Sequence, residues 1–138
     1  MDLVKDNVVY MDEANLNILP EATVVEAAKK MRDKKLSALI VAGGGQNLGI
    51  ITETDLSRKI VAEELNPKET KVKFIMAKPI ITVESDSLMM SAFLKMGSHK
   101  IRHIAVTEDD LVMGILTMSD FVGYYTKKFK KIKPYPTT

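Results

Sequence analysis

The stretch GILTMSD, residues 114–120, decides the fold, because the chain contains nearly the same stretch twice. Residues 49–55, which lie 65 positions earlier, read GIITETD. Each stretch is an apolar run followed by a threonine, a second hydroxyl residue and an aspartate. Packing in a protein core accounts for the apolar half. The polar half requires a separate explanation.

A repeat organises most of the chain. A shift of 65 positions, without a gap, matches ten of the 45 residues from Met11 to Asp55 with identical residues in a second copy. The apolar spacing of each copy predicts the element order β-α-β-β-α. The expected elements are extended segments at 16–18 and 80–83, helices at 23–34 and 87–99, strands at 38–41 and 103–106, strands at 48–52 and 112–117, and second helices beginning near Thr54 and Ser119.

The repeat predicts an α/β fold in which two tandem β-α-β-β-α motifs pack with pseudo-two-fold symmetry, because neither copy alone has enough apolar surface. We expect one module over residues 1–138, with motif 1 at 8–66, motif 2 at 67–126 and a basic C-terminal tail at 127–138. Residues 8–10 are expected to lead into the first motif as residues 73–75 lead into the second.

The composition is that of a globular protein, with 46% hydrophobic and 28% charged residues. The chain has no cysteine, which excludes disulfides, thiolate nucleophiles and thiolate metal sites. Its first residues are too polar for a signal peptide, and no apolar run approaches the roughly 18 residues of a membrane span. We therefore expect a cytoplasmic protein.

The charge is divided unevenly along the chain. Residues 127–133 hold five of the 20 basic residues and no acidic one, so the remainder has 15 basic and 18 acidic residues. Such a helix end is typically solvated and complements the helix dipole. The alternatives are contact with an acidic partner, a nucleic acid or an anionic membrane. Five lysines without a recognition fold give only weak, salt-sensitive attraction, so nucleic-acid binding is not expected.

The glycine run at residues 43–45 is not a phosphate loop. Such a loop requires a following Gly-Lys-[Ser/Thr] and a helix, whereas Gln46 leads here into a predicted strand. The corresponding residues 108–110 are Glu-Asp-Asp, which would repel a phosphate. Both triplets predict turns between antiparallel strands.

The recurring Thr-x-[Ser/Thr]-Asp has two interpretations. In the first, a hydroxyl or carboxylate caps the start of a helix by accepting hydrogen bonds from its free amides. In the second, Asp55 or Asp120 accepts the hydroxyls of a ribose, and the neighbouring hydroxyls and helix-start amides bind a phosphate. A cap needs only one such residue, so the recurrence of three polar residues favours the second interpretation.

The chain resembles the CBS-domain family, named after cystathionine β-synthase, in which two motifs pair to form a Bateman module. The resemblance extends from about Val8 to Tyr125. It is carried by GIITETD and GILTMSD, together with VVYM at 8–11, FIM at 74–76 and HKIRHIAV at 99–106.

This resemblance implies a regulatory module that binds AMP, ADP, ATP or S-adenosylmethionine in clefts between its two motifs and that forms a homodimer. It places the ribose hydroxyls on Asp55 and Asp120. The residues that it places beside the ribose and phosphate are Thr52, Thr54, Thr117 and Ser119. Those that it places around the adenine, partly through backbone hydrogen bonds, are Asn15, Leu16, Asn17, Ile80, Ile81 and Thr82.

The copies differ at the start of the middle strand, where the second has Arg102 and His103 and the first has Ser37 and Ala38. In the family this position often faces the phosphates of the ligand, which an arginine fork or a histidine can bind. Because adjacent strand residues face opposite ways, we expect one of Arg102 and His103 to face the cleft. The second copy is therefore expected to hold a phosphate-bearing ligand more tightly.

The leading hypothesis is a stand-alone nucleotide sensor, not an enzyme, that requires no cofactor and signals to an effector protein by a conformational shift. The rival is a nucleotide-acting enzyme with Asp55, Asp120 and His103 as acid-base groups. Only two histidines occur, and no His-carboxylate cluster has metal-ligand spacing. The residues therefore favour the sensor.

Overall fold

The computed structural model describes residues 2–129, which form two compact units. The first-copy unit comprises Tyr10–Thr82, and the second-copy unit comprises the residues up to Val9 together with those from Val83 onward. The chain therefore passes between the units twice. The sequence repeat and the compact units divide the chain at different places.

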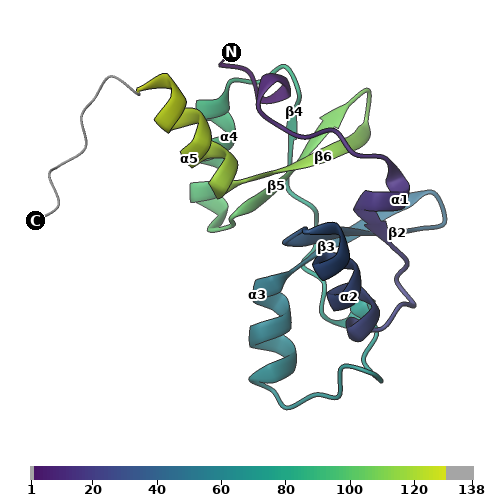
Figure 1. Cartoon of the computed structure of the whole chain (residues 1–138). Helices are drawn as coiled ribbons and strands as arrows, with labels where there is room; N and C mark the ends of the chain where they lie inside the picture. Colours follow the sequence, from purple (N-terminus) through teal and green to yellow (C-terminus); the bar gives the residue numbers. More distant parts are fainter. Residues whose placement is uncertain (1, 130–138) are drawn as a thin grey trace, which may run out of the picture. The chain divides into compact units, whose positions relative to one another are not determined.

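Each copy contributes a three-stranded sheet, with strand orders β1-β2-β3 and β4-β5-β6 (Figure 1). Each sheet is accompanied by helices, as the repeat predicted. The elements of the first-copy unit are α1 (Glu13–Leu16), β1 (Asn17–Ile18), α2 (Val24–Lys34), β2 (Ala38–Gly43), β3 (Gln46–Thr52), α3 (Glu53–Asp55), the π-helical η2 (Leu56–Val61) and the 3-10 turn η3 (Val72–Phe74). The remaining elements are the 3-10 turn η1 (Val4–Asp6), β4 (Thr82–Glu84), α4 (Met89–His99), β5 (His103–Glu108), β6 (Leu111–Thr117) and α5 (Met118–Lys128).

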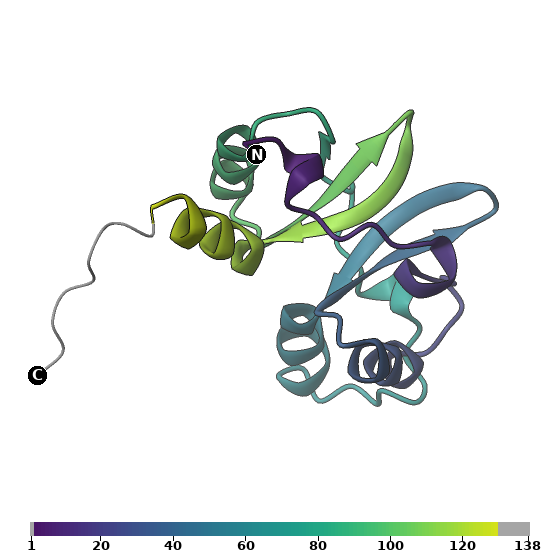
Figure 2. The same cartoon turned by 45° about the horizontal axis from the view of Figure 1, so that its top comes forward.

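Two antiparallel hairpins, β2–β3 and β5–β6, form the centres of the sheets (Figure 2). Gly44 and Gly45 form the first turn with φ of 61° and 75°, and Asp109 and Asp110 form the second with φ of 51° and 64°. Positive φ at both central residues is typical of the two-residue turns that match strand twist. The predicted turns are confirmed, and glycine is not essential to them.

The long helices α2 and α4 each bury one face. The buried residues at their centres are Ala27 and Met31 of α2 and Ala92 and Met96 of α4. Phe93 of α4 stacks on Phe121 of α5 with ring centroids 3.9 Å apart. Lys35 and Lys100, at matching repeat positions, end the two helices in the left-handed conformation with φ of 57° and 55°. Local geometry thus follows the repeat closely in this part of each copy.

The lead-in segments, residues 3–9 and 71–77, do not follow the 65-residue register. Val4 donates its amide to the Ser87 carbonyl at 2.8 Å, and Val72 donates to Ala22 at 2.9 Å. The two donors lie 68 positions apart although the two acceptors lie 65 apart. The expected equivalence of residues 8–10 with 73–75 is therefore wrong. Each lead-in segment bonds to the helix region of the other repeat copy in the sequence.

Helix α1 explains the three additional residues in the first copy. Asp12 caps it by accepting the Asn15 amide at 3.0 Å, and Asn15 and Leu16 are helical. The expected extended segment at 16–18 is wrong for Leu16 and confirmed for Asn17, which begins β1. In the second copy, Ile80 and Ile81 precede β4 and lie outside the strand.

Gly49 and Gly114, the first residues of the two repeated stretches, allow backbone to approach closely. A Cβ atom on Gly114 would lie 2.6 Å from the Val9 carbonyl oxygen, and one on Gly49 would lie 2.8 Å from that of Ala77. Ala77 and Ile50 also exchange backbone hydrogen bonds of 2.8 and 2.9 Å. Each lead-in segment therefore lies directly on the strand at a glycine, and in Figure 1 the N-terminal segment runs beside β6.

Replacing Gly49 or Gly114 with alanine is expected to lower the free energy of unfolding by about 1–3 kcal/mol, because the added methyl group would collide with backbone. Gly97→Ala is the matched control, since Gly97 lies in α4 with open space around it. That substitution should stabilise the protein by about 0.5–1 kcal/mol. Urea unfolding of the three variants measures both effects, and a neutral Gly114→Ala would contradict the close approach.

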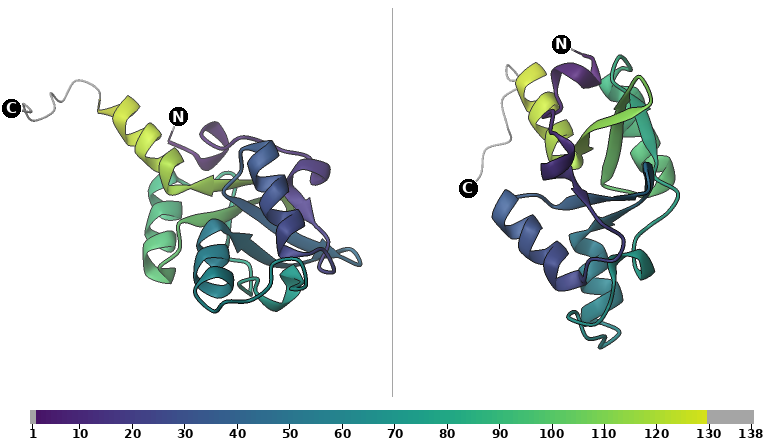
Figure 3. Two further views of the ribbon diagram at one scale, coloured as in Figure 1. Left: turned by 60° about the horizontal axis from the view of Figure 1, so that its bottom comes forward. Right: turned by 90° about the vertical axis from the view of Figure 1, so that its right-hand side faces the viewer.

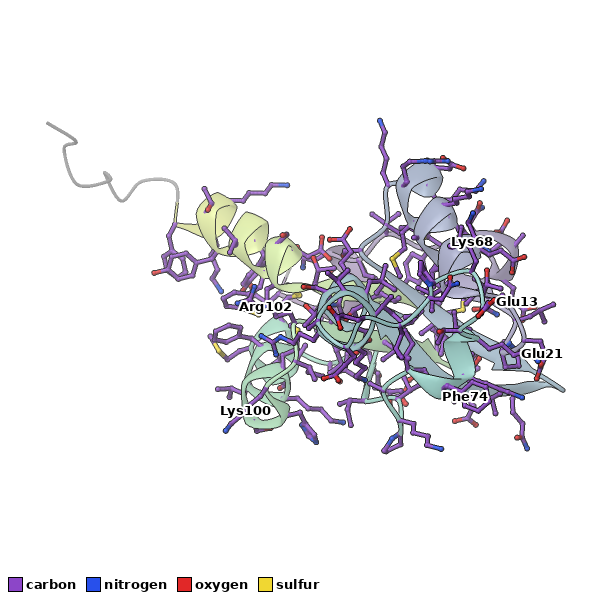
Figure 4. All side chains as sticks on the ribbon, turned by 90° about the horizontal axis from the view of Figure 1, so that it is seen from below. Glu13, Glu21, Lys68, Phe74, Lys100 and Arg102 are labelled. Carbon is purple, nitrogen blue, oxygen red and sulfur yellow. The ribbon has the colours of Figure 1, made fainter. Side chains whose placement is uncertain are left out.

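Glu21 joins the lead-in segment 71–77 to the residues just before α2. Its carboxylate accepts hydrogen bonds of 2.6 Å from both Lys71 and Lys73. Lys71, followed by Lys73, lowers the pKa of Glu21 from 4.5 to about 2. Glu21 and the exposed Phe74, over whose ring Lys73 lies, occupy the same side of this unit (Figure 4).

The depressed pKa of Glu21 predicts a pH-dependent stability. Its contribution is complete above about pH 4.5 and is lost as the pH falls towards 2. Glu21→Gln should therefore lower the thermal midpoint above pH 4.5, and the midpoints of variant and wild type should converge near pH 2. Added salt should reduce the difference. Glu69→Gln, which removes an exposed charge with no ion pair among residues 2–129, should show no such convergence.

Candidate functional site

Strand β6 leads directly into helix α5 (Figure 3), and Thr117 and Asp120 form a reciprocal capping box at this junction. Asp120 Oδ2 accepts hydrogen bonds from the Thr117 amide at 2.8 Å and from its hydroxyl at 3.1 Å. The Asp120 amide donates to Thr117 Oγ1 at 3.1 Å. The helix-capping interpretation is therefore confirmed for this threonine and aspartate.

Thr52 and Asp55 form the same capping box at the end of β3. Asp55 Oδ2 accepts from the Thr52 amide at 2.9 Å and from the hydroxyl at 3.2 Å, and the Asp55 amide donates to Thr52 Oγ1 at 3.4 Å. In both copies one carboxylate oxygen is consumed by the cap. Only Oδ1 can serve any further partner without breaking it.

The middle-strand residues lie beside these caps. His103 pairs with Thr117 across the hairpin as Ala38 pairs with Thr52. The Arg102 carbonyl accepts the Met118 amide at 3.0 Å, and the Ser37 carbonyl accepts the Glu53 amide at 3.1 Å. The residues predicted to bind phosphate and ribose are thus neighbours within each unit.

The side chains at these positions differ in exposure. Arg102 is exposed just before β5, and Figure 4 labels it near α4 and α5, whereas His103 is half-buried and Ala38 is buried. Thr54 and Ser119, the second hydroxyl residues, are exposed, and their side-chain hydroxyls make no hydrogen bond to another residue of the described chain. Capping therefore leaves these two hydroxyls available, in addition to the Oδ1 atoms of the aspartates.

The two aspartates differ in what approaches Oδ1. Lys59 Nζ lies 3.0 Å from Asp55 Oδ1, and it also donates to the Ile75 carbonyl at 2.8 Å. Tyr124 occupies the repeat position of Lys59, and its hydroxyl donates instead to Asp2 Oδ1 at 2.7 Å. Within residues 2–129 no ion pair reaches Asp120. The contact of Lys59 was not predicted from the sequence, although an Asp-to-Lys spacing of four on a helix indicates such a pair.

A second lysine reaches the predicted adenine segment of the first copy. Lys30 Nζ donates to the Ala14 carbonyl at 2.8 Å and also to the Asn17 carbonyl. Burial lowers the pKa of Lys30 below its usual range. Sequence reasoning missed this contact as well, because Lys30 lies 13 positions from Asn17 and meets it only through the fold.

One lysine at the basic end of α5 forms an ion pair with the N-terminal segment. Lys128 Nζ lies 2.9 Å from Asp2 Oδ1, and this hydrogen bond, with that of Tyr124, lowers the pKa of Asp2. Lys127 is exposed, whereas Lys130, Lys131 and Lys133 of the predicted basic tail lie outside the described residues. One of the two described lysines therefore joins α5 to the N-terminal segment.

Residues 2–129 lack two kinds of feature. No group of three or more histidine and acidic side chains is arranged to hold a metal ion. No helix in that range is both long and apolar enough to cross a membrane.

The pairing of two capped strand-helix junctions agrees with the comparison with known families. Residues 4–62 and 72–127 match the CBS domain family. The chain therefore belongs to the CBS-domain family and carries two CBS domains, which together form a Bateman module.

Several known proteins are similar to this chain over most of its length. An uncharacterized protein of Methanopyrus kandleri is 39% identical over 105 residues, which are 75% of this chain and 54% of that protein. The chain thus spans about half the length of this relative. An uncharacterized conserved protein from Pyrococcus horikoshii has a TM-score of 0.79 at 24% identity, covering 99% of this chain and 96% of its own. The hexameric CBS-CP12 protein from bloom-forming cyanobacteria has a TM-score of 0.82 at 29% identity, covering 96% of this chain and 76% of its own.

The capping boxes should contribute measurably to stability. Thr117→Ala removes the N-cap hydroxyl and is expected to lower the free energy of unfolding by about 0.5–2 kcal/mol. Thr117→Ser keeps the hydroxyl and is the matched control. Urea denaturation measures both variants, and an equal loss for serine and alanine would assign the effect to the threonine methyl group.

Proposed function

We propose that this CBS-domain pair is a regulatory module that binds an adenosine-containing ligand, with its main site at the start of α5. The observation that carries the proposal is Asp120 Oδ1. This oxygen has no partner among residues 2–129, although the other carboxylate oxygen is held rigidly by the cap. A fixed carboxylate oxygen at a strand-helix junction suits a ribose hydroxyl.

The neighbouring residues support a phosphate-bearing ligand. The exposed Ser119 hydroxyl and the first amides of the 11-residue helix α5 are donors for phosphate oxygens. Arg102 adds a fork of donors and a positive charge, and His103 adds a ring nitrogen. AMP, ADP and ATP fit this set, and S-adenosylmethionine shares the ribose but lacks the phosphate. A role of Ile80 and Ile81 at the adenine stays a prediction.

Regulation requires that the ligand favour one conformation of the module over another. An effector protein would then read the change in population. We also propose that the chain forms a homodimer. The hexameric CBS-CP12 relative supports self-association, as do the exposed apolar side chains on α4 and α5. Those side chains are Met90, Leu94, Val122 and Tyr125.

A thermal-shift screen against AMP, ADP, ATP, GTP and S-adenosylmethionine tests the ligand class. A ligand at 100 times its dissociation constant should stabilise the protein by about 2.7 kcal/mol. Absence of a shift with every adenosine compound would overturn the proposal. Release of phosphate from ATP by the pure protein would instead support the enzyme hypothesis.

Substitutions at the strand start locate the phosphate site. Arg102→Ala or His103→Ala should weaken AMP and ATP binding by about tenfold or more, since a hydrogen bond to a charged group contributes about 1.5–3 kcal/mol. Ser37→Ala is the matched control, because Ser37 occupies the repeat position of Arg102. Isothermal titration calorimetry measures all three. Unchanged affinity in both variants would contradict this location.

A further inference from the structure

We infer that Lys59 and Lys30 occupy the first-copy counterpart of the nucleotide site, so that the chain binds one adenosine ligand, in the second-copy unit. This inference rests on the proposed function, which it makes more specific. It follows from the contacts of two lysines with the acceptors that a nucleoside would need.

Lys59 occupies the carboxylate. Asp55 Oδ2 already accepts two hydrogen bonds from Thr52, and the Lys59 ammonium lies 3.0 Å from Oδ1. The Asp55 side chain is only 11% exposed, so few directions of approach are left. A ribose hydroxyl would have to displace an ammonium that carries a full positive charge, and it would leave a hydrogen bond in which only the carboxylate is charged.

Lys59 is also held at a second point. Its ammonium donates to the carbonyl of Ile75 at 2.8 Å, and Ile75 is buried in the lead-in segment 71–77, which is part of this unit. Displacing the ammonium from Asp55 would therefore also disturb the bond that joins η2 to residues 71–77. Through these two bonds, Lys59 links η2 to both Asp55 and Ile75 and so stabilises its unit.

Lys30 bonds to a backbone carbonyl in the predicted adenine segment, that of Asn17. Its ammonium donates to Asn17, the first residue of β1, and to Ala14 in α1. The amino group of adenine would need an acceptor of this kind. The partial burial of Lys30, which lowers its pKa, is consistent with an ammonium held inside the unit. The ammonium groups of Lys59 and Lys30 thus bond to the two acceptors, the Asp55 carboxylate and the Asn17 carbonyl, that a ribose hydroxyl and an adenine amino group would need.

The second-copy unit has a different residue at the decisive position. Tyr124 replaces Lys59 and bonds to Asp2, together with Lys128. Asp120 keeps its capping bonds but gains no cation among the described residues. Lys59 and Tyr124 are therefore the specificity-determining pair that distinguishes the two halves.

Reciprocal exchange tests this assignment by calorimetry with AMP. Wild type should bind one AMP per chain, and Lys59→Tyr, alone or with Lys30→Met, should raise the stoichiometry to two. Tyr124→Lys should weaken the wild-type site by about tenfold or more, because it supplies Asp120 with a competing ammonium. Lys59→Arg and Tyr124→Phe are the controls, since neither changes the charge at its position, and both should bind one AMP.

Three outcomes would overturn the inference. They are two AMP molecules per wild-type chain, a double variant that still binds one, and a weaker single site in Lys59→Tyr. The third outcome would mean that Lys59 binds the ligand and does not block its site.

A measurement without ligand separates this inference from the proposed function. A water-soluble carbodiimide joins a carboxylate to a contacting amine: an amide bond forms, and the reagent leaves as a urea carrying one carboxyl oxygen. Mass spectrometry of the wild type should find an Asp55–Lys59 crosslink, with Asp2–Lys128 as the positive control. Tyr124→Lys should gain a crosslink to Asp120. If no adenosine compound binds any variant but these crosslinks form, the proposed function fails and the lysine occupancy stands. If only Asp2–Lys128 reacts, the occupancy fails.

Discussion

The reciprocal hydrogen bonds between Thr117 and Asp120, and between Thr52 and Asp55, are the constraint on which each half depends. They fix the residue at which a strand ends and a helix begins. They also aim the aspartate, because Oδ2 is held by two donors from one threonine. The same side chain therefore serves the stability of the helix and the geometry of the candidate site. The two interpretations of the repeated polar residues are compatible, since a carboxylate has two oxygens and the cap uses one.

With the cap held constant, the residue one helical turn after each aspartate differs between the two copies. The ammonium of Lys59 contacts Asp55. The hydroxyl of Tyr124 bonds to Asp2 and not to Asp120. The apolar half of each repeated stretch has to pack in a core, and Ile51 and Leu116 are both fully buried. Lys59 and Tyr124 are only partly buried, so their positions do not have to fill a core and their side chains can make different polar contacts. Two copies of one folding pattern can thus carry two different electrostatic environments.

The sequence predicted the features that depend on near neighbours. The apolar faces of the helices, the hairpin strands and the turn at 108–110 follow from the pattern of apolar and turn-forming residues within a dozen positions. These predictions agree with the structure. The register of the lead-in segments was not predictable, because it depends on contacts such as that of Val4 with Ser87. The helical state of Asn15 and Leu16 was missed because α1 is a four-residue turn with little periodicity. The Asp55–Lys59 pair was readable from its spacing, but the bond from Lys59 to Ile75 was not.

The lead-in segments also explain why the repeat copies are not independent pieces. Val72 is fully buried in the core around α2, although it follows the first copy's last helix by a long connection. Val4 is equally buried, and its amide bonds to Ser87, more than eighty positions later in the chain. A break in the chain at the repeat boundary would separate buried side chains from the units that they complete. Each unit therefore requires a segment that the sequence assigns to the other copy. Each lead-in segment contacts its strand at the glycine that begins the repeated stretch, so a shift of the segment would change the packing at that glycine.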